Sequence, residues 1–463
     1  MQRLYSYIFN CIYKHFTCHI NEHLRMILVS VCIALMTGIL LFNRTGELND
    51  AKHEMITAIL ILLIIVFSIS GDLRQLEWNK AVFYPFVLFG LSIVAVSFIH
   101  RTGLILLAIE FIFLLPALYY VWMNSGRIAV YYNIVSISVV LEGIISLVFC
   151  FLLSEQGQAF VVDDRYAGFS GGPNQLGEIG VAILIAGLYV FFIKENGFPV
   201  WILSAAGIGT GISYAVISSC RTAMLAELVC ISSAVIYSIK LHIIKREYTR
   251  TFLAQTAITI LLSAGVIYIG LQLDNINYEN LQMQNTSGSM IELSRTPVND
   301  PITVVAYAQT EEQNSIGLLD RFSYNGDINS LSSGRIYLWK LYLENSAPLG
   351  KDDYWEPSTN YEGKMFTYPA HNNIVEYTYR CGYLSGAIYI ILYIVIMIAG
   401  LKLLFKRTNS EYYLIFCIMC IGSFSIYALI EWAAIITRVG TCMYYLSLAP
   451  IMLSASGSQA KRQ

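Results

Sequence analysis

The chain is built from about twelve apolar stretches, each long enough to cross the hydrocarbon core of a membrane, which takes roughly 17 to 25 residues in a helix. Hydrophobic residues make up 56% of the 463 and charged residues only 13%, well below the share that is usual in soluble domains. We therefore predict an all-α polytopic membrane protein with roughly eleven to thirteen spans. The stretches begin near Met26, Met55, Ala81, Leu104, Ile128, Leu176, Val200, Thr222, Phe252, Gly382, Tyr412 and Ile435.

The distribution of positive charge predicts the orientation of these spans. With both termini in the cytoplasm, more than half of the 29 Lys and Arg residues fall on the cytoplasmic side, as the positive-inside rule requires. The predicted order is a cytoplasmic interfacial segment over 1–25, transmembrane helices 1 to 9 over 26–272, a large extracytoplasmic loop over 273–381, transmembrane helices 10 to 12 over 382–453 and a cytoplasmic tail over 454–463.

The segment before the first span has two interpretations. It contains a cluster of potential metal ligands, namely Cys11, His15, Cys18, His19 and His23. Several of them share one helical face, which is compatible with a metal site. We favour a helix that lies in the membrane interface, with Lys14 towards the headgroups and an apolar face in lipid. That apolar face consists of Phe9, Ile12, Tyr13, Phe16 and Ile20.

One connection is far longer than the others. It covers about 107 residues, roughly Asp274 to Arg380, whereas connections in compact architectures usually take only a few residues. Its 14 aromatic residues argue against a disordered linker and suit sugar stacking, so we expect the function in this loop. For Trp339 we favour packing, because it shares the 3.6-residue spacing of a helix face with Ile336, Tyr342 and Leu343.

Four short polar segments carry the candidate chemistry, and the predicted topology puts all four on the extracytoplasmic face. They are FSGGPNQLGE from Phe169, SSCRTAMLAE around Arg221, SSGRIYLW around Arg335 and YPAHNNIVEY around His371. Both arginines fall at the start of a predicted helix, where a positive side chain is unfavourable unless an anion is also present. Phosphate suits such a position because the helix N–H groups and the guanidinium reinforce each other.

Each candidate also has a purely structural interpretation. An arginine at a membrane boundary is often an interfacial anchor, and Arg165 could be such an anchor or a further phosphate contact. A lone histidine in a loop is usually solvated, but His371 stands immediately before a predicted span. Glu178 and Glu431 are the intramembrane carboxylates nearest the extracytoplasmic face, where Arg438 can pair with Glu431 as a structural bridge.

Taken in order, these motifs resemble those of the O-antigen ligase and polymerase superfamily. Gly-Pro-Asn-x-Leu-Gly is followed by Ser-x-x-Arg-x-Ala-x-Leu, by Gly-Arg-x-x-x-Trp with Pro-Leu-Gly after it, and by His-Asn before Gly-x-x-x-Gly-Ala, between about Phe169 and Ile398. The family consists of bacterial membrane glycosyltransferases of the C-type (GT-C) fold, which act on glycans linked to polyprenyl diphosphate. The chain departs from the family pattern at Cys220, where serine is common, and in lacking a second Asn-Pro pairing in the first motif.

The resemblance implies roles for individual residues. Arg221 and Arg335 would hold the diphosphate, and His371 would assist attack by the acceptor hydroxyl, so these three are the predicted catalytic residues. Further substrate contacts are expected from Arg165, Asn174, Arg321, Asn372 and Tyr368.

The chemistry of such a substrate sets what the site must do. Because polyprenyl diphosphate is already a good leaving group, the enzyme has to stabilise its developing charge and deprotonate a sugar hydroxyl. We expect direct displacement with inversion, no cofactor and no metal. The expected partners are a polyprenyl (undecaprenyl) diphosphate-linked oligosaccharide, membrane lipid, and a chain-length regulator and flippase of the same pathway, with no nucleic acid, in the bacterial plasma (inner) membrane.

Three functions remain open. We favour a polymerase of lipid-linked repeat units, which builds O-antigen, capsular polysaccharide or exopolysaccharide. An O-antigen ligase, which moves a finished glycan to lipid A core or to a protein, would carry the same motifs. A lipid-linked oligosaccharide flippase or other transporter is a different class, but transporters usually show internal repeats and short loops.

Overall fold

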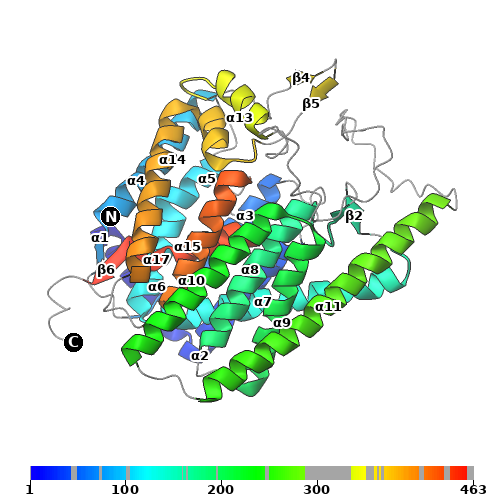
Figure 1. The fold of residues 1–463 in the computed structure, drawn as a ribbon. Helices are drawn as coiled ribbons and strands as arrows, with labels where there is room; N and C mark the ends of the chain where they lie inside the picture. Colours follow the sequence, from blue (N-terminus) through cyan, green and yellow to red (C-terminus); the bar gives the residue numbers. More distant parts are fainter. Residues whose placement is uncertain are drawn as a thin grey trace.

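The computed structural model describes residues 2–42, 50–71, 76–100, 105–158, 160–162, 165–193, 197–245, 250–286, 335–350, 359–361, 364–366, 370–405, 411–431 and 438–455. Helices make up almost all of them (Figure 1). The first half of the bundle contains α1 (Gln2–His15), α2 (Glu22–Phe42), α3 (Asp50–Ser68), α4 (Lys80–His100), α5 (Ile105–Ile109), the π-helix η2 (Glu110–Leu114), α6 (Leu115–Ser125) and α7 (Ile128–Glu155). The second half contains α8 (Pro173–Phe192), α9 (Phe198–Ile217), α10 (Arg221–Lys245), α11 (Arg250–Thr286), α13 (Arg335–Glu344), α14 (Asn373–Phe405), α15 (Tyr413–Ile430), α16 (Val439–Ser447) and α17 (Ala449–Met452).

Within these ranges, 10 helices are long and apolar enough to cross a membrane, which confirms the prediction of an all-α polytopic membrane protein. The helix α3 lies where the second span is predicted. The predicted twelfth span is shorter than expected, since its apolar helix covers only Val439–Met452. Proline lacks the N–H that would continue a helix, and Pro450 stands in the first turn of α17, directly after α16 ends.

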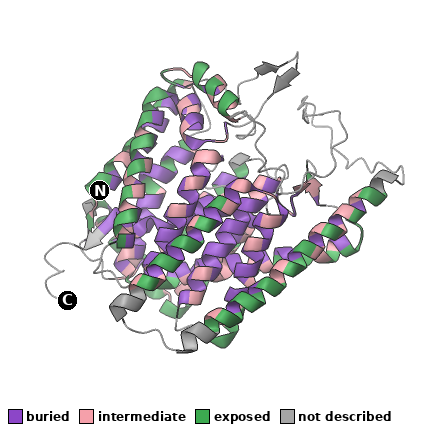
Figure 2. Cartoon of the chain, viewed as in Figure 1, coloured by how far each residue is buried: buried purple, intermediate pink, exposed green. Residues whose placement is uncertain are grey.

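The centre of the bundle is α8, which is almost entirely buried (Figure 2). It packs against α9 through glycines: a Cβ on Gly180 would lie 2.8 Å from the carbonyl oxygen of Gly211, and one on Gly211 would lie 2.7 Å from that of Gly180. Small residues let two membrane helices approach until their backbones touch. Since lipid is as apolar as the helices, this van der Waals packing, and not the hydrophobic effect, holds them together. By contrast, α11 lies at the edge of the bundle and is largely exposed (Figure 2).

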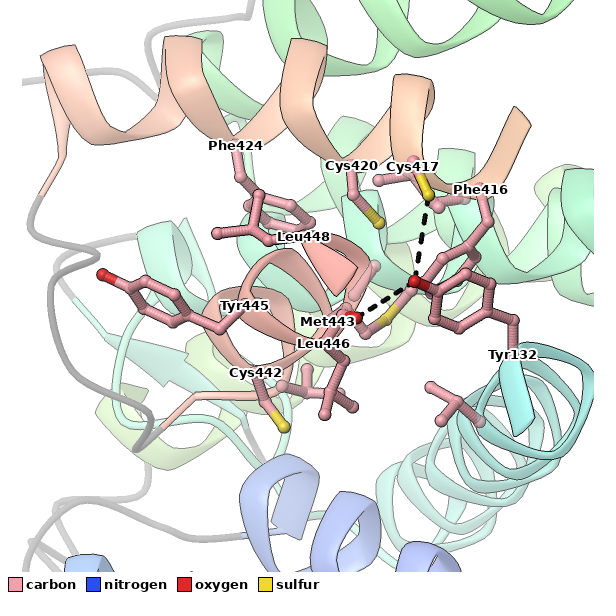
Figure 3. Packing of buried hydrophobic residues seen from close by; sticks show 14 of the residues in the cluster. Tyr132, Phe416, Cys417, Cys420, Phe424, Cys442, Met443, Tyr445, Leu446 and Leu448 are labelled. Carbon is pink, nitrogen blue, oxygen red and sulfur yellow. Dashed lines mark hydrogen bonds between the residues drawn. The ribbon is translucent and has the colours of Figure 1, made fainter. Parts of the chain in front are cut away.

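Aromatic and sulfur side chains fill the core between α7, α15 and α16 (Figure 3). The rings of Tyr132 and Phe416 stack with centroids 4.6 Å apart. The Tyr132 hydroxyl donates to the carbonyl oxygen of Leu446 at 3.1 Å and lies 3.8 Å from the sulfur of Cys417. A buried hydroxyl costs stability unless it has a partner, so this contact fixes α16 against α7.

The N-terminal helix differs from its prediction. Phe9, which we expected in lipid, is only 4% exposed, and it stacks on Tyr5 and Tyr120 with centroids 5.6 and 6.1 Å away. Ser6 also hydrogen-bonds to Tyr120 at 2.7 Å. One face of α1 therefore packs on α6 inside the protein, while Phe16 remains 50% exposed.

Three short antiparallel pairs of strands stand outside the helices. β1 (Leu76–Trp78) pairs with β6 (Leu453–Ala455), which ties the segment before α4 to the end of the last helix. β2 (Val161–Val162) pairs with β3 (Arg165–Tyr166), and β4 (Thr359–Tyr361) with β5 (Lys364–Phe366).

The long connection begins later and ends earlier than the predicted 273–381, because α11 continues to Thr286 and α14 starts at Asn373. Within α14 the helix is broken at Gly382, whose φ of 86° is favoured only by glycine. A Cβ there would lie 2.7 Å from the amide nitrogen of Gly350 and closer still to the carbonyl oxygen of Pro348. The span was predicted to begin at Gly382, which is the position of this break inside α14, and the Pro-Leu-Gly motif packs directly on it.

Candidate functional site

Glu431 is the centre of the candidate site. It directly follows α15, and only 3% of its side chain is exposed. One carboxylate oxygen, Oε1, accepts a hydrogen bond from the guanidinium of Arg335, and the other, Oε2, lies 2.8 Å from Nδ1 of His371. The side chains of Arg335 and His371 remain 19% and 23% exposed. The carboxylate is thus sealed, whereas both of its partners can still reach a ligand.

The charge of Glu431 decides which nitrogen of His371 carries a proton. Burial on its own raises the pKa of the Glu431 carboxyl, but the hydrogen bond and charge of His371 and the charges of Arg335 and Arg438 outweigh it. The pKa of Glu431 therefore lies below its usual range, and the group is ionised at neutral pH. An ionised carboxylate only accepts hydrogen bonds, so Nδ1 must be the donor. In the neutral imidazole this leaves Nε2 with a free lone pair.

The backbone holds His371 in an uncommon conformation. Its φ of 51° lies in the left-handed region, which costs a non-glycine residue roughly 1 to 3 kcal/mol and persists only where neighbours enforce it. On one side, the N–H of Ala370 donates to Glu376 at 2.8 Å and its carbonyl accepts from the indole of Trp339 at 2.7 Å. On the other side, Asn372 directly precedes α14.

Asn372, predicted to contact substrate, has its polar atoms engaged in the fold. Its Oδ1 accepts from the N–H groups of Ile374 and Val375 at 2.9 and 3.1 Å, which caps α14. Its Nδ2 donates to the carbonyl of Leu429 at 2.9 Å, two residues before Glu431. Asn372 thus joins α14 to the end of α15, and its predicted contact with substrate stays a prediction.

Arg335 opens α13, as predicted, and the packing of that helix fixes its position. Tyr342 is fully buried and its ring lies 4.9 Å from that of Tyr379 on α14. Trp339 packs beside it, so the favoured packing interpretation of Trp339 is confirmed. The other two residues of the predicted face are not buried, since Ile336 is 42% and Leu343 47% exposed.

A second pair lies beside the first, formed by Arg438, which we predicted to bridge to Glu431, and Glu178. The guanidinium of Arg438 donates to Oε2 of Glu178 at 3.1 Å, and Thr441 donates to Oε1 at 3.3 Å. Burial disfavours the charged guanidinium, but the charge and hydrogen bond of Glu178 outweigh this effect and raise the pKa of Arg438. Arg438 is thus hydrogen-bonded to Glu178, and its charge also acts on Glu431.

The segment around Asn174 and the segment before Arg221 are joined through Arg165, and Asn174 also contacts α15. Arg165 donates to the carbonyl of Ser218 at 2.7 and 3.0 Å and to Oδ1 of Asn174 at 3.1 Å. The hydroxyl of Tyr427, four residues before Glu431, donates to the carbonyl of Asn174 at 2.5 Å. Asn174 is thus held by Arg165 and α15, and both residues have structural partners in addition to their predicted role in substrate binding.

Arg221 stands at the start of α10, as predicted, one residue after Cys220. The Cys220 sulfur lies 3.8 Å from the Tyr427 hydroxyl. Burial, followed by the negative charge of Glu431, raises the pKa of the Cys220 thiol, while the charge of Arg165 opposes it. The start of α10 therefore lies close enough to Glu431 and to Arg165 for both charges to act on it.

Two predicted contacts, Arg321 and Tyr368, lie outside the residues that the structure describes. Among the residues that it does describe, no three His, Cys, Asp or Glu side chains are arranged to hold a metal ion, and this includes the Cys11 to His23 cluster. Arg335 and His371, both predicted, contact the same carboxylate, that of Glu431. The sequence did not predict Glu431 as their partner. A signal for Glu431 was present in the sequence, since an ionisable group at the end of a span is costly to bury and is often functional.

Comparison with models of known protein families and with curated proteins gives no match for this chain.

Proposed function

We propose that this chain is a bacterial inner-membrane glycosyltransferase of the GT-C type that polymerises repeat units carried on polyprenyl diphosphate. The observation that carries the proposal is the single buried carboxylate of Glu431, which holds both Arg335 and His371 while leaving each partly exposed. A guanidinium beside a correctly oriented imidazole combines an anion-binding group with a proton acceptor. Transfer of a sugar from a diphosphate needs these two capacities together.

In this proposal His371 acts as the general base. A hydroxyl of the acceptor sugar donates its proton to Nε2, and its oxygen forms a bond with the anomeric carbon of the donor. The bond from that carbon to the diphosphate oxygen breaks with its electron pair, which inverts the anomeric centre. Glu431 accepts a hydrogen bond from Nδ1 and stabilises the imidazolium that forms, as a carboxylate does for the histidine of a hydrolase triad.

The arginines receive the charge that develops on the leaving group. Arg335 is the primary candidate, because it is ordered at the start of α13 and retains exposure. Arg221 at the start of α10 would add a guanidinium next to helix N–H groups. Arg165 would support this end of the site by holding Asn174 and Ser218 in place.

The same chemistry would serve a ligase, since the leaving group is identical and only the acceptor differs. A flippase would need the arginines to bind diphosphate but would not need an oriented base. The hydrogen bond between His371 and Glu431 therefore favours an enzyme over a transporter.

The test is incubation of the purified protein in detergent with a polyprenyl diphosphate-linked repeat unit, with products resolved by size. Arg335→Ala and His371→Ala are each expected to abolish the ladder of longer products. Lys340→Ala is the matched control, because Lys340 lies on α13 like Arg335, but its side chain is 72% exposed and pairs with Glu344 in the next turn.

Each outcome separates the alternatives. A ladder that both site variants abolish, and that Lys340→Ala retains, supports the polymerase. Transfer that requires added lipid A core or protein acceptor would identify a ligase. A ladder that persists in both site variants would contradict the assignment of these residues. Absence of any product in detergent, with translocation of the intact lipid after reconstitution into vesicles, would indicate a flippase.

A further inference from the structure

A cavity of about 490 Å³ lies among the ends of five helices, away from the candidate site. Its walls come from α1, the start of α2, the end of α3, the end of α6 and the start of α7. The polar residues that matter are Arg25, Arg127, Ser68, Asn124 and Tyr13, with Glu22 as the carboxylate among the lining residues.

The cavity and Glu431 are at opposite ends of the bundle. The start of α8 belongs to the candidate site, because Glu178 binds Arg438 there. Further along α8, Tyr189 donates a hydrogen bond to the carbonyl of Ala129 at 3.2 Å, in the first turn of α7. Tyr189 follows Glu178 by 11 positions, which corresponds to roughly 16 Å of helix, so a ligand in the cavity would be separate from the glycan site.

Several polar atoms around this cavity are buried without a hydrogen-bond partner among the residues that the structure describes. They are Nε of Arg25, Oγ of Ser68 and Oδ1 of Asn124. Arg25 is held in place at its other end, since Nη1 donates to the carbonyl of Ile69. Buried polar groups are normally satisfied, so an unpartnered guanidinium nitrogen and hydroxyl beside a cavity indicate a missing acceptor.

The charge of the cavity favours an anion. Arg127 immediately precedes the 28-residue α7, whose first N–H groups carry a partial positive charge towards the same space. In this structure Arg127 pairs with Glu22, but the two side chains are 42% and 55% exposed. Ion pairs this exposed contribute little, so a stronger acceptor can replace Glu22.

The surroundings of the cavity are apolar and exposed. Phe16, three residues after the lining residue Tyr13, is 50% exposed, and Leu24 and Ile27, on either side of the lining residues Arg25 and Met26, are 48% and 45% exposed. A polar cavity bordered by apolar surface at the ends of membrane helices is the arrangement that binds the headgroup of an anionic lipid.

We propose that this cavity is a binding site for a phosphate group, supplied by the headgroup of an anionic phospholipid. Arg25, Arg127 and Ser68 donate hydrogen bonds to the phosphate oxygens, while the acyl chains lie along the exposed apolar side chains after α1 and at the start of α2. The site is independent of the proposed glycosyl transfer and would exist in a transporter as well.

Native mass spectrometry of the delipidated full-length protein tests this proposal. Phosphatidylglycerol is titrated against phosphatidylcholine with the same acyl chains, and thermal unfolding is measured in parallel. The wild type is expected to bind phosphatidylglycerol preferentially and to unfold at a higher temperature with it. Arg25→Gln and Arg127→Gln should each weaken the binding by about tenfold, the usual effect of losing a charged hydrogen bond. Ser68→Ala should weaken it several-fold without loss of folding.

Controls at the same end of the bundle separate the site from general surface charge. Lys80→Gln removes a positive charge from an exposed position outside the cavity and should leave binding unchanged. Glu22→Gln should strengthen binding, whereas Glu77→Gln, at an exposed position on β1, should not.

A second arm distinguishes the source of the phosphate. Displacement of phosphatidylglycerol by excess inorganic phosphate, with an equal rise in unfolding temperature, would retain the phosphate site but assign it to the free ion. Equal binding of the two lipids with no effect of phosphate would overturn the proposal. So would an equal loss of binding in Lys80→Gln and Arg25→Gln, since it would mean that surface charge alone attracts the lipid.

Discussion

Nδ1 of His371 lies 2.8 Å from Oε2 of Glu431, although α14 and α15 both separate the two residues in the chain. If this carboxylate orients the base, Glu431→Gln should lower the rate of glycan polymerisation by about 10² to 10⁴, the usual contribution of general base catalysis. A glutamine can present its N–H₂ to Nδ1 and select the wrong tautomer. The rate and its pH profile measure this, and Glu142→Gln, which removes a carboxylate that binds Thr37 within the bundle, is the control expected to keep activity.

The pH dependence of stability follows from the lowered pKa of Glu431. Because burial is outweighed by His371, Arg335 and Arg438, the folded protein holds this carboxyl below its ordinary pKa of about 4.3. The resulting stabilisation is fully present above that value and is lost as the pH falls through the lower folded value. The difference in unfolding temperature between wild type and Glu431→Gln should therefore shrink as the pH falls below about 4.

The control for that experiment is Glu344→Gln, whose side chain is 61% exposed on α13. It should change the unfolding temperature little at any pH, because exposed ion pairs contribute little. A difference for Glu431→Gln that grows on acidification would contradict the assigned direction of the pKa shift.

The pair formed by Arg438 and Glu178 should be worth more to stability than to catalysis. Glu178→Gln removes the carboxylate charge that accepts the hydrogen bond of the guanidinium, and removing one partner of a buried pair costs about 3 to 5 kcal/mol. Since the Arg438 side chain keeps 28% exposure, we expect a loss near the lower end, about 3 kcal/mol. The double variant Glu178→Gln with Arg438→Gln should recover part of it, which denaturation in detergent measures.

The break in α14 should tolerate no side chain at Gly382. Gly382→Ala adds a Cβ against the backbone of Pro348 and Gly350 at a φ of 86°, so it should destabilise the protein and displace α13. Gly265→Ala is the matched control, because nothing lies within 4 Å of its added Cβ; it should be neutral or stabilise by up to about 1 kcal/mol. Equal unfolding temperatures for both variants would contradict this account of the break.

The sequence predicts the spans well because apolar length is a local property, and α2, α4 and α7 lie where they are expected. It predicts Phe9 poorly, since lipid and a protein core are equally apolar and only the tertiary packing on Tyr120 distinguishes them. Membrane solvation therefore limits how far hydrophobicity can separate buried from lipid-facing positions.

In the site, Arg335 and His371 stand out locally because each precedes a helix. Their common partner could not be predicted, because Glu431 reaches them only through the packing of α15 on α14. Proximity in the chain favoured a bridge from Arg438 to Glu431, but it gave no sign of the pair that Arg438 forms with Glu178. The capping role of Asn372 was accessible, since asparagine before an apolar helix is a strong N-cap signal.

At Gly350 and Gly382, two segments of the main chain approach each other with no side chain between them. Such a joint does not depend on the identity of the neighbouring side chains. The exposed residues of α13, among them Ile336, Tyr337 and Leu343, can therefore change with little effect on where Arg335 lies. The backbone contact and the exposed surface of α13 are therefore separate features of this connection, and the surface can vary in sequence while the contact is kept.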